Sequence, residues 1–155
     1  MHSNGATGMA ILRRDGFASM STTGEGSLTT RPVTFTGKYL FVNVDCPSGE
    51  LKVEILDKNN KVIDDLSADK CKAVSIDSTI QQIEWNGSSD LSSLVGQEVK
   101  FRFKLKNGDL YAFWVSPSTN GESNGYVAGG GPGYISNKDT EGKKAYEQAS
   151  GLQKF

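Results

Sequence analysis

The sequence predicts an all-β protein, an antiparallel two-sheet β-sandwich of jelly-roll type, and three observations lead to this fold class. Apolar residues recur at every second position along most of the chain, which is the period of a strand with one buried face. Turn-forming residues separate about ten such stretches, and no long helical pattern interrupts them. Glycine is abundant, at 18 residues, as expected for a turn-rich chain. A closed barrel is the alternative architecture for the same pattern.

The candidate strands run from residue 9 to residue 116. In chain order they are 9–13, 17–21, 27–35, 39–44, 50–56, 61–63, 72–75, 81–85, 98–105 and 110–116. The connections between them contain Gly, Pro, Asn or Asp, the residues that turn conformations favour. One internal helical turn is predicted at 90–96, opened by Asp90 and closed by Gly96.

Two hairpins are predicted in detail. Asn107-Gly108 predicts a type I′ turn, because both central residues of that turn need positive φ. Its register places Phe101, Phe103, Leu105, Leu110, Ala112 and Trp114 toward the core, and Arg102, Lys104, Tyr111 and Phe113 outward. A second hairpin over 39–56 places Leu40, Val42, Val44, Leu51, Val53 and Ile55 inward, and Tyr39, Phe41, Asn43, Lys52 and Glu54 outward.

Both predicted hairpins therefore carry aromatic rings among polar groups on the outward face, and three explanations are open. A loop or the C-terminal tail covers the rings, another domain or subunit contacts them, or they stack on a sugar whose hydroxyls bond to the polar groups. For the sugar, the candidate carbohydrate-binding residues are the rings of Tyr39, Phe41, Tyr111 and Phe113 and the polar side chains of Asn43, Glu54 and Arg102.

After residue 116 the composition changes to Gly, Ser, Asn and Pro. We predict a β-sandwich domain over 1–134 and a polar C-terminal tail over 135–155. The tail is either free or pinned to the sandwich through Tyr126, Tyr134 and Ile135. Near the other end, Arg14 and Asp15 follow an apolar stretch, and they either clamp a strand end or reach a partner.

The length and charge of the chain restrict its partners. A chain of 155 residues is about one domain long and buries roughly 70% of the surface that its unfolded form exposes. The net charge is -1, so there is no cationic surplus to collect nucleic acid or an anionic membrane, and neither is expected as a partner. No apolar run is long enough for a spanning helix, and residues 1–16 lack the features of a signal peptide.

Groups for catalysis and metal binding are scarce. The single histidine, His2, makes Ser-His-Asp or Cys-His catalysis and a zinc site poor hypotheses. No cofactor is expected, although a calcium ion among turn carboxylates stays open. A carboxylate pair for glycoside hydrolysis also stays open, because folding brings such groups together. Cys46 and Cys71 are expected as two buried free thiols, with a disulfide between them as the alternative.

Several blocks of the sequence carry a family resemblance. "MAILRRDGFASM", "LTTRPVTFTGKYLFVNVDCPSGELKVEILD" and "VKFRFKLKNGDLYAFWVSPS" resemble, in order and spacing, the C-terminal β-sandwich that follows a five-bladed propeller in bacterial proteins similar to glycoside hydrolase families 32 and 43. The resemblance covers approximately residues 2–134. It implies a concanavalin-A-like jelly roll that is ancillary to a sugar-active enzyme. The catalytic carboxylates of such enzymes lie in the propeller, so no catalytic residue is carried over.

From the residues and the resemblance together, we expect a non-catalytic carbohydrate-binding or accessory module. Its expected partners are a poly- or oligosaccharide and a catalytic propeller domain, and the chain looks like an excised domain. The parent enzymes imply a secreted or periplasmic location. The main alternative is a structural packing domain that braces the propeller without binding glycan, and a stand-alone glycosidase is a third hypothesis.

Overall fold

The computed structural model describes residues 5–8, 12–88, 90–127 and 133–152. The chain is mostly β, with 41% strand and 10% helix, and its sheet is antiparallel, which confirms this part of the predicted fold class. No helix in the described ranges is both long enough and apolar enough to span a membrane.

Among the described residues, the strands join into one five-stranded sheet. Its members are β1 (Met20–Thr29), β2 (Tyr39–Asp45), β3 (Glu50–Leu56), β4 (Asp77–Gln82) and β5 (Lys100–Ser116). The 3₁₀ turns η1 (Asp64–Leu66) and η2 (Ser92–Leu94) and the helix α1 (Lys143–Leu152) complete the described elements. β5 is central: β1 pairs with one side of it, β2 and β3 pair in succession with the other, and β4 lies beyond β2.

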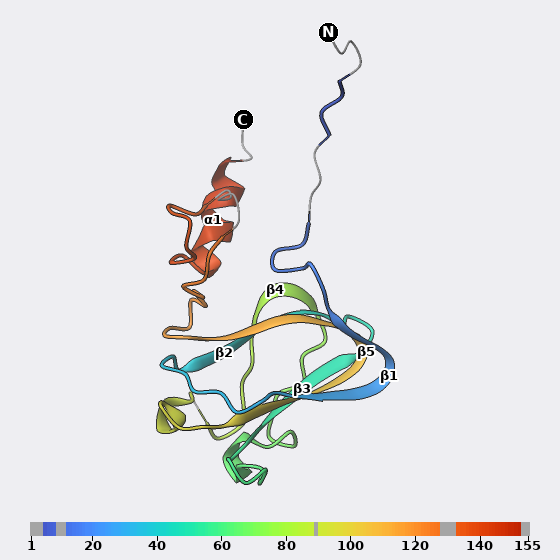
Figure 1. Ribbon diagram of the computed structural model, residues 1–155, viewed down its shortest axis with the longest axis vertical. Helices are drawn as coiled ribbons and strands as arrows, with labels where there is room; N and C mark the ends of the chain where they lie inside the picture. Colours follow the sequence, from blue (N-terminus) through green and yellow to red (C-terminus); the bar gives the residue numbers. More distant parts are fainter. Residues whose placement is uncertain (1–4, 9–11, 89, 128–132, 153–155) are drawn as a thin grey trace.

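The sheet folds over on itself, so that its two halves face each other across the core (Figure 1). The first half of β5 lies between β1 and β3, and the second half pairs with the start of β1 and with β2. The alternation predicted for β2 and β3 is confirmed. The inward side chains, each at most 1% exposed, are Leu40, Val42, Val44, Leu51, Val53 and Ile55.

The two predicted hairpins are wrong, because β5 is one bent strand and β2 and β3 run in the same direction along it. Asn107 has a φ of 44°, but Gly108 lies outside the positive-φ region that a type I′ turn requires. Gly108 is needed for a different reason, because the main chain here passes close to Asp45 and Cys46. A Cβ at Gly108 would lie 2.6 Å from the Asp45 carbonyl oxygen and from Cys46 Cβ. A Cβ at Gly49 would likewise clash with the β5 main chain, so both Gly-containing turns are corners of the folded sheet.

Leu110 points inward as predicted, but the predicted faces of β5 are wrong from Ala112 onward, and a β-bulge is the reason. The register between β2 and β5 shifts at Tyr111, which places one extra residue in β5. An extra residue reverses the alternation that follows it. Phe113 therefore points inward, with its ring centroid 5.0 Å from that of Phe103, whereas Ala112 and Trp114 take the outer side.

Other predicted elements are partly confirmed. The helical turn is present as η2, where the Asp90 carboxylate accepts a hydrogen bond from the Ser92 N–H at 2.9 Å and Gly96 has a φ of 75°. The single strand β1 contains parts of two predicted strands, 17–21 and 27–35. The predicted strands 61–63 and 72–75 are absent as strands and form only isolated β-bridges. Most of the predicted strand 9–13 lies outside the described residues.

The C-terminal segment, residues 117–127 and 133–152, folds back onto the outer face of β2 and β5. It lies on the same side of the sheet as residues 12–19, which we call the N-terminal segment (Figure 1). Phe41 is 0% exposed, because Gly121 packs against its ring and the Lys143 ammonium lies 5.1 Å from the ring centroid. Coverage by the tail, the first of the three explanations for outward rings, therefore holds for Phe41.

Candidate functional site

A cleft of about 790 Å³ lies between the N-terminal segment and the C-terminal segment, above the second half of β5. Its apolar and aromatic lining comes from segments far apart in the chain, and its large members are Leu12, Phe17, Phe113, Trp114, Tyr126, Val127, Tyr134 and Tyr146. Three rings face solvent strongly: Phe17 is 86% exposed, Tyr126 is 76% exposed and Tyr146 is 42% exposed. Open aromatic side chains gathered around one hollow are the usual lining of a ligand site.

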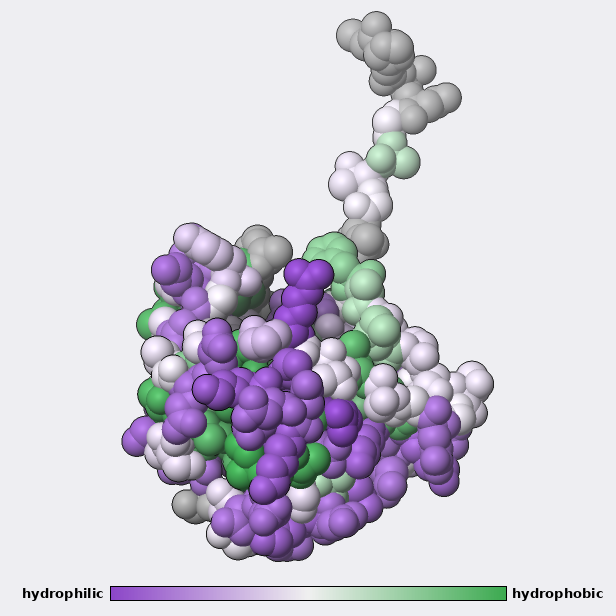
Figure 2. All heavy atoms as spheres, turned by 60° about the horizontal axis from the view of Figure 1, so that its bottom comes forward, coloured by the Kyte–Doolittle hydropathy of each residue, from purple (hydrophilic) through white to green (hydrophobic). Residues whose placement is uncertain are grey.

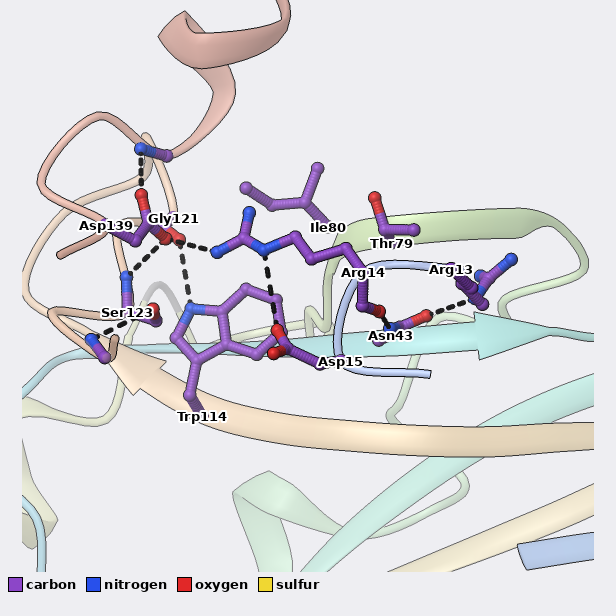
Figure 3. A network of polar contacts seen from close by, with 12 residues as sticks. Arg13, Arg14, Asp15, Asn43, Thr79, Ile80, Trp114, Gly121, Ser123 and Asp139 are labelled. Atoms are coloured by element: carbon purple, nitrogen blue, oxygen red, sulfur yellow. Dashed lines mark hydrogen bonds and ion pairs between the residues drawn. The ribbon is translucent and has the colours of Figure 1, made fainter. Parts of the chain in front are cut away.

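Arg14 ties the two segments together at the base of the cleft (Figure 3). Its guanidinium donates to the Asp139 carboxylate at 2.5 Å, and its Nε lies 3.4 Å from the Asp15 carboxylate. The same guanidinium lies over the Tyr134 ring, 5.4 Å from the centroid, and 6.0 Å from that of Trp114. The Arg14 side chain is 17% exposed, so it forms the floor of the cleft more than its rim.

Asp139 receives further bonds from its own segment. The N–H groups of Gly142 and Ser123 donate to its carboxylate at 2.7 Å and 3.0 Å. Burial raises the pKa of this carboxyl, but these N–H groups and Arg14 outweigh the burial and hold the pKa below its usual range. Burial also raises the pKa of Tyr134 to about 12, so this hydroxyl keeps its proton and can donate.

Arg13 ties the N-terminal segment to the sheet, as Arg14 ties it to the C-terminal segment. It donates to the Asn43 side chain at 2.7 Å, to the Val44 carbonyl at 3.0 Å and to the Asp77 carboxylate at 2.5 Å. Its guanidinium lies over the Tyr111 ring, 4.7 Å from the centroid. The residue that clamps a strand is therefore Arg13, which the prediction did not include, whereas Arg14 bonds to the C-terminal segment and Asp15 lies beside Arg14.

The structure separates the predicted carbohydrate-binding residues into two groups on different halves of the folded sheet. The first group lies on the outer side of β2 and the second half of β5. Here Phe41 and Asn43 are 0% exposed, and Tyr39 and Tyr111 are half-buried. Phe113 turns its ring toward the core, although the residue is half-buried and lines the cleft described above. Phe41 and Asn43 are covered by other parts of the chain.

The second group lies on the half of the sheet formed by β3 and the first half of β5. Glu54 is buried there, with Arg102 at 2.8 Å and Lys104 at 3.1 Å from its carboxylate oxygens. Burial raises the Glu54 pKa, but the bonds from these two cations outweigh it and hold the pKa below its usual range. Seen with the bottom of Figure 1 brought forward, the surface is largely hydrophilic (Figure 2). Glu54 and Arg102 therefore form a structural ion pair, distant from the cleft residues in the fold.

No group of three or more His, Cys, Asp or Glu side chains capable of holding a metal ion occurs in the described part of the chain. His2 lies outside that part. Cys46 and Cys71 are free, buried thiols, so the disulfide alternative is wrong. Burial raises the pKa of Cys71, which keeps it protonated.

The cleft was missed at the sequence level because its residues come from three separated segments. Phe17 and Tyr126 are more than 100 positions apart, and alternation along a strand says nothing about either. A usable signal was the concentration of Tyr residues in the glycine-rich C-terminal segment, facing the paired arginines at positions 13 and 14. Comparisons of this chain with protein-family models, with curated proteins and with solved structures find no match.

Proposed function

We propose that this chain is a non-catalytic carbohydrate-binding module, and that its binding site is the aromatic cleft. The observation that carries the proposal is the solvent-facing pair Phe17 and Tyr126, 86% and 76% exposed, on opposite segments of one hollow. Large rings held open to water are costly unless something covers them. A pyranose offers a flat C–H face that packs against such rings.

The cleft also supplies groups that bond hydroxyls. The Asp15 carboxylate is 53% exposed and accepts, and the Ser123 hydroxyl lines the cleft and donates or accepts. Tyr134 adds a protonated hydroxyl as a donor. Rings combined with a few directed polar groups fit the recognition of a polyhydroxylated ligand. The concanavalin-A-like jelly roll, the parent glycosidase and the exported location that the resemblance implies form part of the same proposal.

A structural packing domain is the second candidate, and a different observation favours it. Leu12, Phe17 and Met20 are 54%, 86% and 58% exposed, and they follow one another along the N-terminal segment into β1. A row of apolar side chains of this kind also suits burial against a neighbouring propeller domain. In that case the rings would be covered by protein and the chain would bind no glycan of its own.

Affinity electrophoresis on a panel of plant and microbial polysaccharides tests the proposal. We expect retarded migration on at least one polymer, and a loss of about tenfold in affinity for Phe17→Ala or Tyr126→Ala, because each ring contributes about 1.4 kcal/mol of stacking. Ile135→Ala is the matched control, since Ile135 is 77% exposed but does not line the cleft.

The outcomes separate the hypotheses. Retardation that the two cleft variants lose and the Ile135 variant keeps supports the carbohydrate-binding module. Unchanged migration on every polymer favours the packing domain. Release of reducing sugar by the purified chain would point instead to a glycosidase.

A further inference from the structure

The two arginines at the cleft are already paired with carboxylates of the protein. Arg13 bonds to Asp77 at 2.5 Å, and Arg14 bonds to Asp139 at 2.5 Å with Asp15 at 3.4 Å. Two guanidinium groups against three carboxylates leave this group with one negative charge. Each arginine therefore already has a carboxylate partner, and the one Arg14 nitrogen without a hydrogen bond, Nη1, is buried.

An acidic sugar would meet an unfavourable environment in this cleft. A uronate or sulfate that took the Arg14 Nη2 bond would displace Asp139, whose carboxylate is 0% exposed and would be left buried without its cation. Arg14 Nη1 has no hydrogen-bond partner, but it is buried, so an external anion reaches it only by displacing the residues around it. The Asp15 carboxylate, which lines the cleft and is 53% exposed, would repel the incoming anion. Charge complementarity thus disfavours anionic ligands.

A cationic ligand is disfavoured for a second reason, because the rings already carry cations. The Arg14 guanidinium lies 5.4 Å from the Tyr134 centroid, and the Lys138 ammonium lies 5.3 Å from the Tyr126 centroid. A ring that holds a cation on one face attracts a second cation less strongly on the other. Lys138 brings the charge of the whole group to zero, so discrimination against anions depends on the local charge of Asp15 and not on the net charge of the cleft.

We infer that the cleft takes an uncharged oligosaccharide and discriminates against sugars that bear carboxylate or sulfate groups. The inference rests on the proposed glycan-binding function and narrows its ligand class. Neutral sugars need only ring stacking and hydroxyl bonds, which leave the ion pairs of Arg13 and Arg14 intact.

The test uses affinity electrophoresis with matched polymers, such as hydroxyethyl cellulose against carboxymethyl cellulose, galactan against polygalacturonate and dextran against dextran sulfate. Each pair is compared at low salt and at about 1 M NaCl, where the Debye length is about 3 Å. Asp15→Asn is the informative variant. Asp15 has a φ of 48°, and Asn tolerates this region as well as Asp does, so the substitution removes the charge while keeping the backbone.

We expect a neutral polymer to retard the protein, with an affinity that changes less than about twofold between low and high salt. At low salt, the affinity for the acidic counterpart should be at least about tenfold weaker. Asp15→Asn should reduce the ratio of the neutral-polymer affinity to the acidic-polymer affinity by severalfold. Stronger retardation by the acidic member, abolished by salt, would overturn the inference while leaving glycan binding in place. An unchanged ratio in Asp15→Asn would overturn the role given to the charge of Asp15. No retardation by any polymer would refute the proposed function itself.

Discussion

Replacing Asp139 with asparagine tests whether the clamp at the base of the cleft holds the C-terminal segment on the sheet. The Asp139 carboxylate is 0% exposed and accepts bonds from the Gly142 N–H, the Ser123 N–H and the Arg14 guanidinium. Asn has nearly the same size, but one of its two accepting oxygens becomes an NH₂ donor. Whichever way the amide turns, at least one buried N–H loses its acceptor.

The cost follows from these contacts. A buried donor left without a partner costs about 1–3 kcal/mol, and removing one member of a buried ion pair costs about 3–5 kcal/mol. The Arg14 side chain is 17% exposed, so water partly replaces the lost carboxylate. Because the two costs count the same lost bonds, they are not added, and we expect Asp139→Asn to lose about 2–4 kcal/mol of stability, the middle of the span from about 1 to 5 kcal/mol.

The loss should be local. Ser123, Asp139 and Gly142 belong to the C-terminal segment, and none of them is part of the apolar core between the two halves of the sheet. Segments with few core contacts open separately from the global unfolding transition. We expect the variant to release the C-terminal segment while β2 and β5 stay folded.

The effect also depends on pH. The Asp139 pKa in the folded protein lies below its unfolded value of about 3.9, so the carboxylate stabilises the fold above that pH. This contribution is lost as the pH falls through the lowered folded pKa. The difference in stability between the natural protein and Asp139→Asn should therefore be largest near neutral pH and shrink below about pH 4.

Hydrogen exchange measures this opening directly. The Trp114 indole N–H donates to the Gly121 carbonyl at 3.0 Å and reports attachment of the segment, as do the N–H groups of Ser123 and Gly142. These three should exchange faster in Asp139→Asn, with unchanged protection in β2. The exposed Asp69→Asn is the matched control. Equal acceleration in β2, or a stability change within about 0.5 kcal/mol, would refute the reasoning.

Three shorter predictions follow from the core. Gly108→Ala should destabilise the fold by about 3 kcal/mol or more in a urea titration, because the added Cβ would lie 2.6 Å from the main chain. Gly24→Ala, at the open edge of β1, is the control and should cost less than about 1 kcal/mol. Cys46 and Cys71 should react with a thiol reagent after unfolding and very slowly before it, because both are buried. Trp85→Phe should cost about 1–3 kcal/mol by thermal or urea unfolding, because it leaves a buried β3 carbonyl without its indole donor at 2.9 Å.

Local features of the fold could be predicted from the sequence, and pairing across the fold could not. The range 50–56 matches β3, and 39–44 matches β2 to within one residue, because alternation and turn residues are local signals. The Asn107-Gly108 pair was misinterpreted because a sheet corner and a hairpin turn share the same residues. In a hairpin, residues 100–105 would pair with residues 110–116. In this fold, both stretches belong to β5 and pair with β1, β2 and β3 instead.

The site residues were misplaced for a related reason. One bulge residue, Tyr111, moves Phe113 from the outer face to the core, and nothing in the local sequence marks the bulge. The cleft itself depends on where the C-terminal segment lands. That position is fixed by the bond between Arg14 and the buried Asp139, which are 125 positions apart.

The composition of the outer face of the sheet shows which part of it the C-terminal segment covers. β2 and β3 lie end to end along β5, yet their outward residues differ in kind. On β2 they are Phe41 and Asn43, both 0% exposed under the terminal segments, and on β3 they are Lys52 and Glu54, whose charges meet the cations of the neighbouring strand. A strand needs a second apolar face only where a further layer covers it. The change from aromatic to charged side chains along this line therefore marks the edge of the covering layer, and the aromatic cleft opens beside the covered half.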